Sequence, residues 1–144
     1  MFPLLAVAGL LLAADAPKDA ANKELDRLQG TWVMESLEID GKTVPADKIK
    51  DATLTIKGDR YITKTGGKEY VARIARIDPS KKPKEIDMSF PSGPEGDKVA
   101  AGIYELDGDR LKLVRAQAAG QPRPTDFGTW PNTGVFMVVW KRAQ

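Results

Sequence analysis

The stretch VAAGIYELDGDRLKLVR, from Val99 to Arg115, decides the fold class of this chain. It holds two runs rich in Val, Ile, Leu and Tyr, and an Asp-Gly-Asp sequence at 107–109 separates them. Apolar and β-branched residues favour strands, and Asp and Gly tolerate the positive φ angles of a tight turn between antiparallel strands. The stretch therefore predicts a β-hairpin with strands at 99–106 and 110–115.

The same chemistry recurs along the chain. Asp40-Gly41, Lys57-Gly58-Asp59 and Gly66-Gly67 each stand between two apolar runs. Short apolar runs at this spacing indicate an antiparallel all-β domain. The predicted strands are 31–39, 52–57, 60–65, 69–77, 85–90, 99–106, 110–115 and 134–141, with one helical turn at 45–50.

Eight consecutive antiparallel strands can close on themselves, which removes exposed sheet edges. We therefore predict an eight-stranded antiparallel up-and-down β-barrel over residues 30–142. Residues 17–29 form a helix-favouring segment in which Leu25 and Leu28 share one side, and Gly30 ends it. We expect this short helix to lie across one end of the barrel.

Composition excludes several classes of function. Of 144 residues, 42% are hydrophobic and 29% are charged, with a net charge of only +2, which does not favour nucleic acid as a partner. The chain has no Cys and no His, which excludes disulfides, a Ser-His-Asp triad and metal sites built on Cys or His. We therefore expect no enzymatic activity, no cofactor and no metal.

The N-terminus carries an apolar segment. Leu4 to Ala14 reads LLAVAGLLLAA, which is too short to span a bilayer but suits the core of a signal peptide. We predict a signal peptide at 1–16, cleaved after Ala14 or Ala16, and export to the periplasm or the extracellular space without a stable membrane span. The alternative is that this segment forms a buried helix or strand of the domain.

The sequence LQGTW, from Leu28 to Trp32, resembles the Gly-x-Trp signature of lipocalin and fatty-acid-binding barrels. Further segments extend the likeness: Ile39–Lys42, Leu54–Asp59, Asp78–Lys84, Gly102–Asp109, Pro122–Phe127 and Lys141–Arg142. Together they resemble the Planctomycetes uncharacterised domain, a lipocalin-like family, over Leu28 to Arg142. That family has no established activity, so the resemblance implies fold and export, and ligand binding only by analogy.

The resemblance also implies a structural role for Trp32. In lipocalins the signature Trp packs against a basic residue of the last strand and seals one end of the barrel. Here the implied partner is Arg142. Lys141 is the alternative, because neighbouring residues of a strand face opposite sides.

Two hypotheses for function stay open. In the first, the barrel binds a small apolar or amphipathic molecule inside. In the second, the barrel is filled, and its outer face or the loop at 116–133 contacts a partner protein that the sequence does not identify. The candidate cavity lining for the first is Leu54, Ile56, Tyr61, Ile86, Met88, Phe90, Tyr104, Leu111, Leu113 and Met137.

Three arginines are candidate polar anchors for a ligand. Strict alternation places Arg73 and Arg76 on opposite faces of their strand, so one of them is expected inside. An inward Arg needs an anion, which is either a ligand carboxylate or an internal salt-bridge partner such as Glu85, Asp87 or Glu105.

The third anchor is Arg123, in the proline-stiffened loop QPRPTDF at 121–127, where Asp126 is its nearest candidate partner. This loop either covers a ligand as a lid or plugs the barrel with Phe127 and Trp130. The run KKPK at 81–84 is interpreted as a solvated loop, with a docking patch for an anionic partner as the alternative.

The first testable prediction concerns export. Because the apolar core ends at Ala14, protein recovered from its native host should begin near Asp15 or Pro17. N-terminal sequencing measures this directly. Cytoplasmic protein that retains Met1 would show that the apolar segment is part of the domain.

Overall fold

The structure, a computed structural model, describes residues 18–91 and 98–144. A helix covers residues 18–28, and a short 3-10 helix, η1, follows the first two strands. The predicted signal peptide at 1–16 lies outside the described residues. The elements in chain order are β1 (Gly30–Ile39), β2 (Lys42–Thr43), η1 (Ala46–Lys48), β3 (Thr53–Lys57), β4 (Arg60–Thr65), β5 (Lys68–Asp78), β6 (Lys84–Ser89), β7 (Val99–Asp107), β8 (Arg110–Ala116) and β9 (Val135–Arg142).

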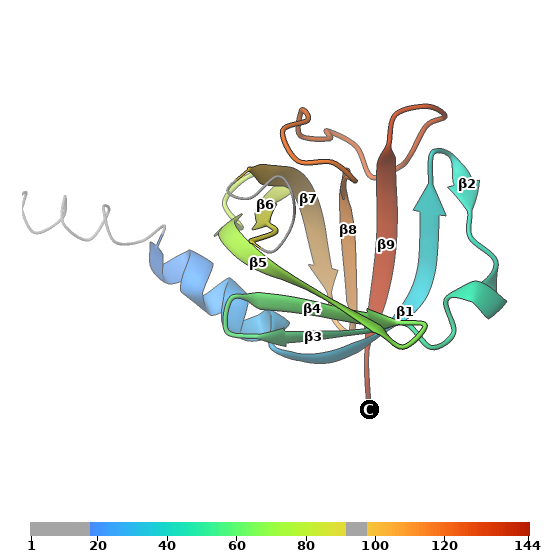
Figure 1. The fold of residues 1–144 in the computed structure, drawn as a ribbon. Helices are drawn as coiled ribbons and strands as arrows, with labels where there is room; N and C mark the ends of the chain where they lie inside the picture. Colours follow the sequence, from blue (N-terminus) through green and yellow to red (C-terminus); the bar gives the residue numbers. More distant parts are fainter. Residues whose placement is uncertain (1–17, 92–97) are drawn as a thin grey trace, which may run out of the picture.

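All strand pairs are antiparallel, and the sheet closes because β1 pairs with β9 as well as with β3. The eight strands β1 and β3–β9 form the barrel, while β2 adds a two-residue edge beside β1. Figure 1 shows the helix against the end of the barrel near β3, β4 and the first part of β1. The predicted fold is confirmed; β2 was missed because two residues carry no strand pattern.

The predicted turns lie where the sequence places them. Asp40 and Gly41 between β1 and β2 have φ angles of 50° and 81°, and two positive angles in succession define the tight hairpin turn that suits twisted strands. At the start of β1, Gly30 has φ 120°, and a Cβ there would lie 3.3 Å from Arg142 Nη1. The chain therefore needs glycine between the helix and the barrel.

One face of the helix packs against the barrel. Leu28 is fully buried, while Ala21 and Leu25 pack against the same core. The spacing of these residues puts them on one side of an α-helix. Inside the barrel they meet the aromatic and aliphatic side chains of the strands, so the half of the barrel beside the helix is solid.

The face of the helix also carries a buried carboxylate. Glu24 is 3% exposed and accepts hydrogen bonds from the Tyr104 hydroxyl at 2.7 Å and Lys84 Nζ at 2.9 Å. Burial by itself raises the pKa of Glu24, but the bonds from Tyr104 and Lys84 outweigh it and hold the pKa below its ordinary value. Glu24 therefore attaches the helix to β6 and β7 as an anion.

Trp32 and Arg142 join the end of the helix to the barrel. Trp32 is fully buried, its Nε1 donates to the Leu28 carbonyl at 3.1 Å, and the Arg142 guanidinium carbon lies 4.1 Å from the centre of its ring. Arg142 also donates to the carbonyls of Gln29 at 2.9 Å and Arg27 at 2.7 Å. The predicted contact is present, and Arg142 rather than Lys141 makes it.

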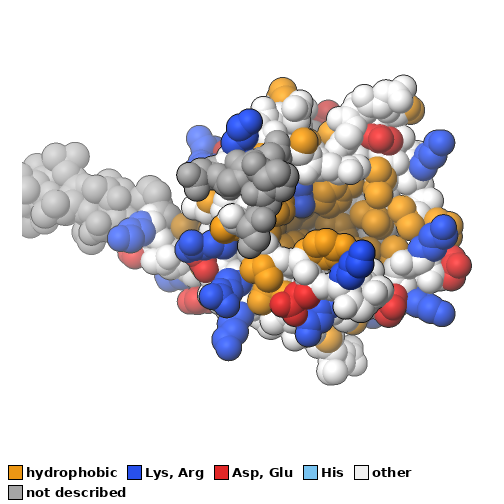
Figure 2. All heavy atoms as spheres, viewed as in Figure 1, with side chains coloured by type: hydrophobic (Ala, Val, Ile, Leu, Met, Phe, Trp, Pro, Cys, Tyr) orange, Lys and Arg blue, Asp and Glu red, His pale blue; other side chains and the backbone are white. Residues whose placement is uncertain are grey.

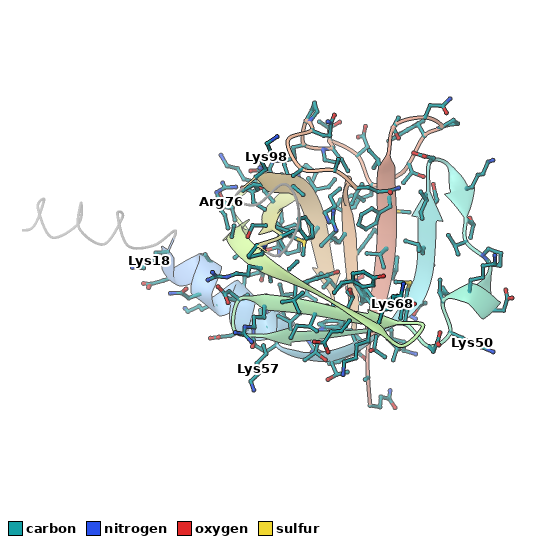
Figure 3. The ribbon with its side chains drawn as sticks, viewed as in Figure 1. Lys18, Lys50, Lys57, Lys68, Arg76 and Lys98 are labelled. Atoms are coloured by element: carbon teal, nitrogen blue, oxygen red, sulfur yellow. The ribbon has the colours of Figure 1, made fainter. Side chains whose placement is uncertain are left out.

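The prediction that Arg73 or Arg76 points into the barrel is wrong. A bulge in β5 between Ile74 and Arg76 inserts one residue, so the alternation shifts and both arginines lie outside. Arg73 pairs with Asp59 at 2.6 Å on the surface. Figure 3 shows Arg76 on the outside of the barrel, as it does Lys57 and Lys68.

Arg76 nevertheless meets two of the carboxylates that the sequence nominated. Its guanidinium lies 3.3 Å from Glu85 and 3.6 Å from Asp87, and 2.9 Å from Asp78. These pairs lie on the outer face of β5 and β6, so they are surface ion pairs of small stabilising effect and form no internal anchor.

The contact between Trp32 and Arg142 gives a stability prediction. Trp32→Ala should lower the free energy of unfolding by about 3–5 kcal/mol, because it removes a fully buried aromatic ring. Arg142→Ala should cost about 1–3 kcal/mol through the lost ring contact and the helix carbonyls left without a donor. Denaturant unfolding of both single variants and the double variant measures the coupling. Losses that add within about 0.3 kcal/mol would contradict the contact.

Glu24 gives a prediction with a pH dependence. Glu24→Gln should lower the free energy of unfolding at pH 7 by about 1.5–3 kcal/mol, the range for hydrogen bonds to a charged group. Because the folded-state pKa is lowered, the stabilisation by the charge is present above the ordinary carboxyl pKa and is lost as the pH falls through the folded-state value. The free energies of unfolding of the wild-type protein and of Glu24→Gln should therefore converge as the pH is lowered. A difference that stays constant with pH would show that the charge of Glu24 has no effect.

Candidate functional site

The half of the barrel away from the helix is hollow. It contains a cavity of about 650 Å³ that opens on the face shown in Figure 2, where hydrophobic side chains gather in a depression. The walls come from β1, β4, β5, β8 and β9 and from residues next to β3, β6 and β8. The lining residues are Met34, Leu37, Ile39, Ala52, Tyr61, Thr63, Lys64, Thr65, Tyr70, Val71, Ala72, Phe90, Arg115, Gln117, Phe136, Val138 and Trp140.

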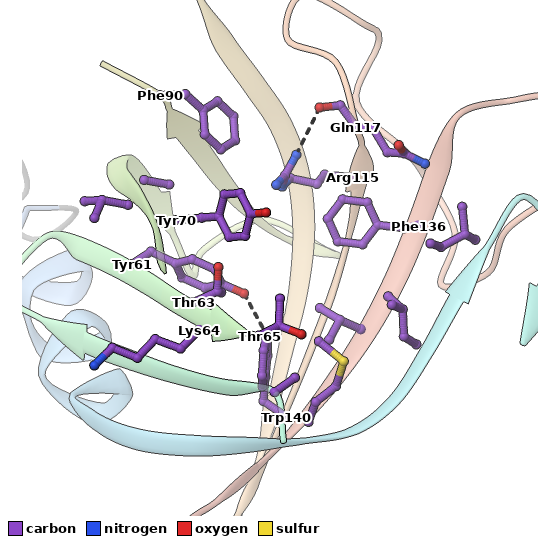
Figure 4. A pocket seen from close by; sticks show the side chains of 17 residues that line it. Tyr61, Thr63, Lys64, Thr65, Tyr70, Phe90, Arg115, Gln117, Phe136 and Trp140 are labelled. Carbon is purple, nitrogen blue, oxygen red and sulfur yellow. Dashed lines mark hydrogen bonds between the residues drawn. The ribbon is translucent and has the colours of Figure 1, made fainter. Parts of the chain in front are cut away.

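Two hydrogen-bonded aromatic side chains separate the cavity from the solid half. Trp140 Nε1 donates to the Tyr61 hydroxyl at 2.8 Å, and both side chains are buried. Burial raises the pKa of Tyr61 to about 12, so its hydroxyl keeps its proton at neutral pH. This pair, from β4 and β9, gives the cavity an apolar wall with one hydroxyl in it (Figure 4).

The opening of the cavity exposes apolar surface. Tyr70 and Val71, on β5, are 55% and 41% exposed and line the cavity at the same time. Lys64 and Thr65, on β4, and Gln117, just after β8, add polar groups to the lining. An apolar interior that reaches the surface and is edged by polar groups is typical of sites for small molecules.

Arg115, the last residue but one of β8, is a cation within this apolar wall. Its guanidinium carbon lies 4.9 Å from the ring centre of Phe90 and 4.6 Å from that of Phe136, and Figure 4 shows the guanidinium between the two rings. Its Nη1 donates to the carbonyls of Ala116 at 2.9 Å and Gln117 at 3.5 Å. Burial lowers the pKa of Arg115, yet an arginine stays protonated at neutral pH.

Of the predicted lining residues, Tyr61 and Phe90 border the cavity. Seven others face the interior, but they are almost completely buried and fill the half of the barrel beside the helix; they are Leu54, Ile56, Ile86, Met88, Tyr104, Leu111 and Leu113. Alternation identified the inward face of each strand, but it does not say at which height along the barrel the packing stops. For these seven residues the expected lining role is corrected to one in the core.

Met137 was assigned to the wrong face. Val138 and Trp140 are buried and line the cavity, so the intervening positions of β9, Met137 among them, point outward. The strand is apolar on both sides of the sheet, with the sequence VFMVVW at 135–140, so its pattern did not distinguish the two faces.

Arg123 lies outside the cavity, and the expected partner Asp126 does not hold it. Its Nη2 lies 2.7 Å from Asp87 Oδ1, and its Nη1 donates to the Gly102 carbonyl at 2.8 Å. Gly102 permits a close approach of neighbouring chain, since a Cβ there would lie 2.9 Å from the Val114 carbonyl oxygen. Arg123 therefore fastens the loop at 117–134 to β6 and β7.

The other end of the same loop is fastened to the turn between β1 and β2. The Thr129 hydroxyl donates to Glu38 and accepts from the Gly41 amide at 2.7 Å. Asp40 accepts a bond from the Gly134 amide at 2.6 Å. These bonds hold the loop along the rim of the barrel, where only Gln117 of its residues contributes to the cavity lining.

The expectation that Phe127 and Trp130 plug the barrel is wrong. The Phe127 ring lies 5.7 Å from Lys112 Nζ, against the outside of β8, and Trp130 is 51% exposed. Neither residue lines the cavity. The hydrogen bonds of Arg123 and Thr129 keep the loop beside the opening, so its aromatic side chains stay outside the cavity.

The basic run at 81–84 borders a second, smaller hollow of about 270 Å³ on the outer surface. Lys84 already pairs with the buried Glu24 at 2.9 Å, while Lys81 and Lys82 are exposed. This arrangement fits the solvated-loop interpretation of the run.

Sequence reasoning missed the residue that gives the cavity its charge. In β8, Leu111, Leu113 and Arg115 are alternate positions and share the inward face. That register was readable from the hairpin sequence, because Arg115 alternates with two leucines of the same predicted strand. Its aromatic neighbours Phe90 and Phe136 come from distant parts of the chain, and no local pattern joins them to it.

Three comparisons with known proteins returned nothing: no family model, no curated protein and no solved structure matches this chain. Within residues 18–91 and 98–144, His, Cys, Asp and Glu form no group of three or more that is suited to hold a metal ion. In the same part of the chain, no helix has the length and hydropathy to cross a membrane.

Proposed function

We propose that this chain is an exported, non-enzymatic, lipocalin-like protein that binds a small apolar or amphipathic molecule inside its barrel. The observation that carries the proposal is the cavity of about 650 Å³ with a mostly apolar lining. Cavities for small ligands commonly measure about 300–1,000 Å³ and combine apolar walls with a few polar groups.

The division of the barrel into two halves supports the proposal. Beside the helix the interior is closely packed, and Leu54, Met88 and Leu113 are completely buried. A stable core in that half leaves the other half free to stay hollow, since the fold does not depend on filling it. The alternative hypothesis requires a filled barrel, and only the half beside the helix is filled.

The rim supports a preformed site. The loop at 117–134 is attached through Arg123 at one side and through Thr129 at the other. A ligand that enters such a cavity meets walls that are already ordered, so little conformational entropy is lost on binding.

The alternative, a contact with a partner protein through the loop, has one observation in its favour. Trp130 is 51% exposed on a loop whose ends are fixed, and exposed aromatic residues often form the centre of protein interfaces. Trp130→Ala separates the two proposals, because Trp130 does not line the cavity and its loss should leave ligand affinity unchanged.

A matched pair of substitutions on β5 tests the ligand-binding proposal. Ala72 lines the cavity and Ala75 is exposed on the outside of the same strand. N-phenyl-1-naphthylamine, a neutral apolar fluorophore, should bind the wild-type protein, and Ala72→Phe should weaken binding at least about tenfold by filling the cavity. Ala75→Phe adds the same ring outside and should bind the fluorophore like wild type.

Circular dichroism and thermal unfolding confirm that both variants are folded, and Thr63→Trp provides a second way to fill the cavity. Absence of fluorophore binding by the wild-type protein would contradict the proposal. Equal binding by the wild-type protein and a folded Ala72→Phe variant would also contradict it, because the fluorophore would then lie elsewhere.

A further inference from the structure

Arg115 forms no ion pair with a carboxylate among residues 18–91 and 98–144. Both of its hydrogen bonds are made by Nη1, to the carbonyls of Ala116 and Gln117. An arginine has five N–H donors, so in the described part of the chain the three on Nε and Nη2 have no acceptor. The side chain belongs to the cavity wall, which places this unpaired edge of the guanidinium at an apolar cavity.

A cation in such a position is costly unless something compensates it. Loss of water around a charged group destabilises it by several kcal/mol on the order given for buried ions. The rings of Phe90 and Phe136, at 4.9 and 4.6 Å, offset part of this through attraction between the cation and their π electrons. They supply no negative charge, so an anion inside the cavity would still gain a strong interaction.

The two rings also restrict how an anion can approach. The ring centres of Phe90 and Phe136 lie 4.9 and 4.6 Å from the guanidinium carbon and flank it in Figure 4, so the rings occupy part of the space from which an anion could reach it. The Nη1 side is held by main-chain carbonyls, which leaves the edge formed by Nε and Nη2. A carboxylate is planar and accepts two parallel N–H bonds from such an edge.

We propose that the ligand of this cavity is an amphipathic carboxylate, whose head group pairs with the Nε and Nη2 edge of Arg115. The inference rests on the ligand-binding function proposed above. The apolar part of the ligand lies against Met34, Val138 and Trp140, on the wall next to Arg115. The positive charge of Arg115 thus gives the ligand one orientation in a cavity whose lining is mostly apolar.

Wild-type protein provides the first test. Decanoate and 1-decanol carry the same chain with and without the negative charge, and each competes with N-phenyl-1-naphthylamine for the cavity. Decanoate should bind at least about tenfold more tightly than decanol. This factor corresponds to the lower end of the stabilisation that hydrogen bonds to charged groups provide. Decyl sulfate, with a tetrahedral head group, should bind more weakly than decanoate.

Two methionine variants assign the effect to Arg115. Arg115→Met replaces the cation with an apolar side chain of similar length. In this variant decanoate and decanol should bind about equally well, while the neutral fluorophore still binds. Lys64→Met is the matched control, because Lys64 also borders the cavity but its side chain is 66% exposed. This control should keep the wild-type preference.

The outcomes separate this inference from the function on which it rests. Equal binding of decanoate and decanol to wild type, with the fluorophore still bound, would overturn the carboxylate assignment and leave the ligand-binding function standing. Equal binding of decyl sulfate and decanoate would overturn the choice of carboxylate over other anions. If neither the fluorophore nor any decyl compound binds, the ligand-binding function itself fails. The wild-type comparison decides the inference even if Arg115→Met does not fold.

Discussion

The contact between Arg142 and Trp32 holds together the end of this barrel at which the interior is densely packed. Arg142 lies 4.1 Å from the Trp32 ring and donates to two carbonyl groups at the C-terminal end of the helix. Helix ends leave carbonyls without partners, and a cation there also interacts favourably with the helix dipole. One side chain of the last strand thus attaches the helix, the first strand and the last strand to one another.

The consequences extend through the interior. With the helix held in place, Leu28 and Glu24 are buried, and the large side chains of β3, β6, β7 and β8 pack beneath them. Dense packing at this end supplies the hydrophobic stabilisation that a domain of this size requires. The opposite end is free to remain open, and Tyr61 and Trp140 mark the boundary between the two.

The open half combines a mostly apolar wall with Arg115, whose guanidinium lies against two aromatic rings of that wall. Arginines on the outer face of β5 meet carboxylates, as Arg73 and Arg76 do, whereas Arg115 is held by aromatic rings and main-chain carbonyls. A mostly apolar cavity with a cation that pairs with no carboxylate among the described residues is suited to a molecule with an apolar body and a negative head. The proposals on ligand class follow from this difference in partners.

The sequence by itself determined the strands and the turns between them, because these depend on local chemistry. The sealing pair was implied by the resemblance to lipocalins, and the structure decided that Arg142 rather than Lys141 contacts Trp32. Asp and Gly at the turns permit positive φ, and alternation identified inward positions such as Leu54 and Leu113. Only the tertiary structure decided where the barrel is hollow and which charges face it. The bulge that moves Arg76 outward, the height at which packing ends, and the meeting of Arg115 with Phe90 and Phe136 all arise from contacts between strands distant in sequence.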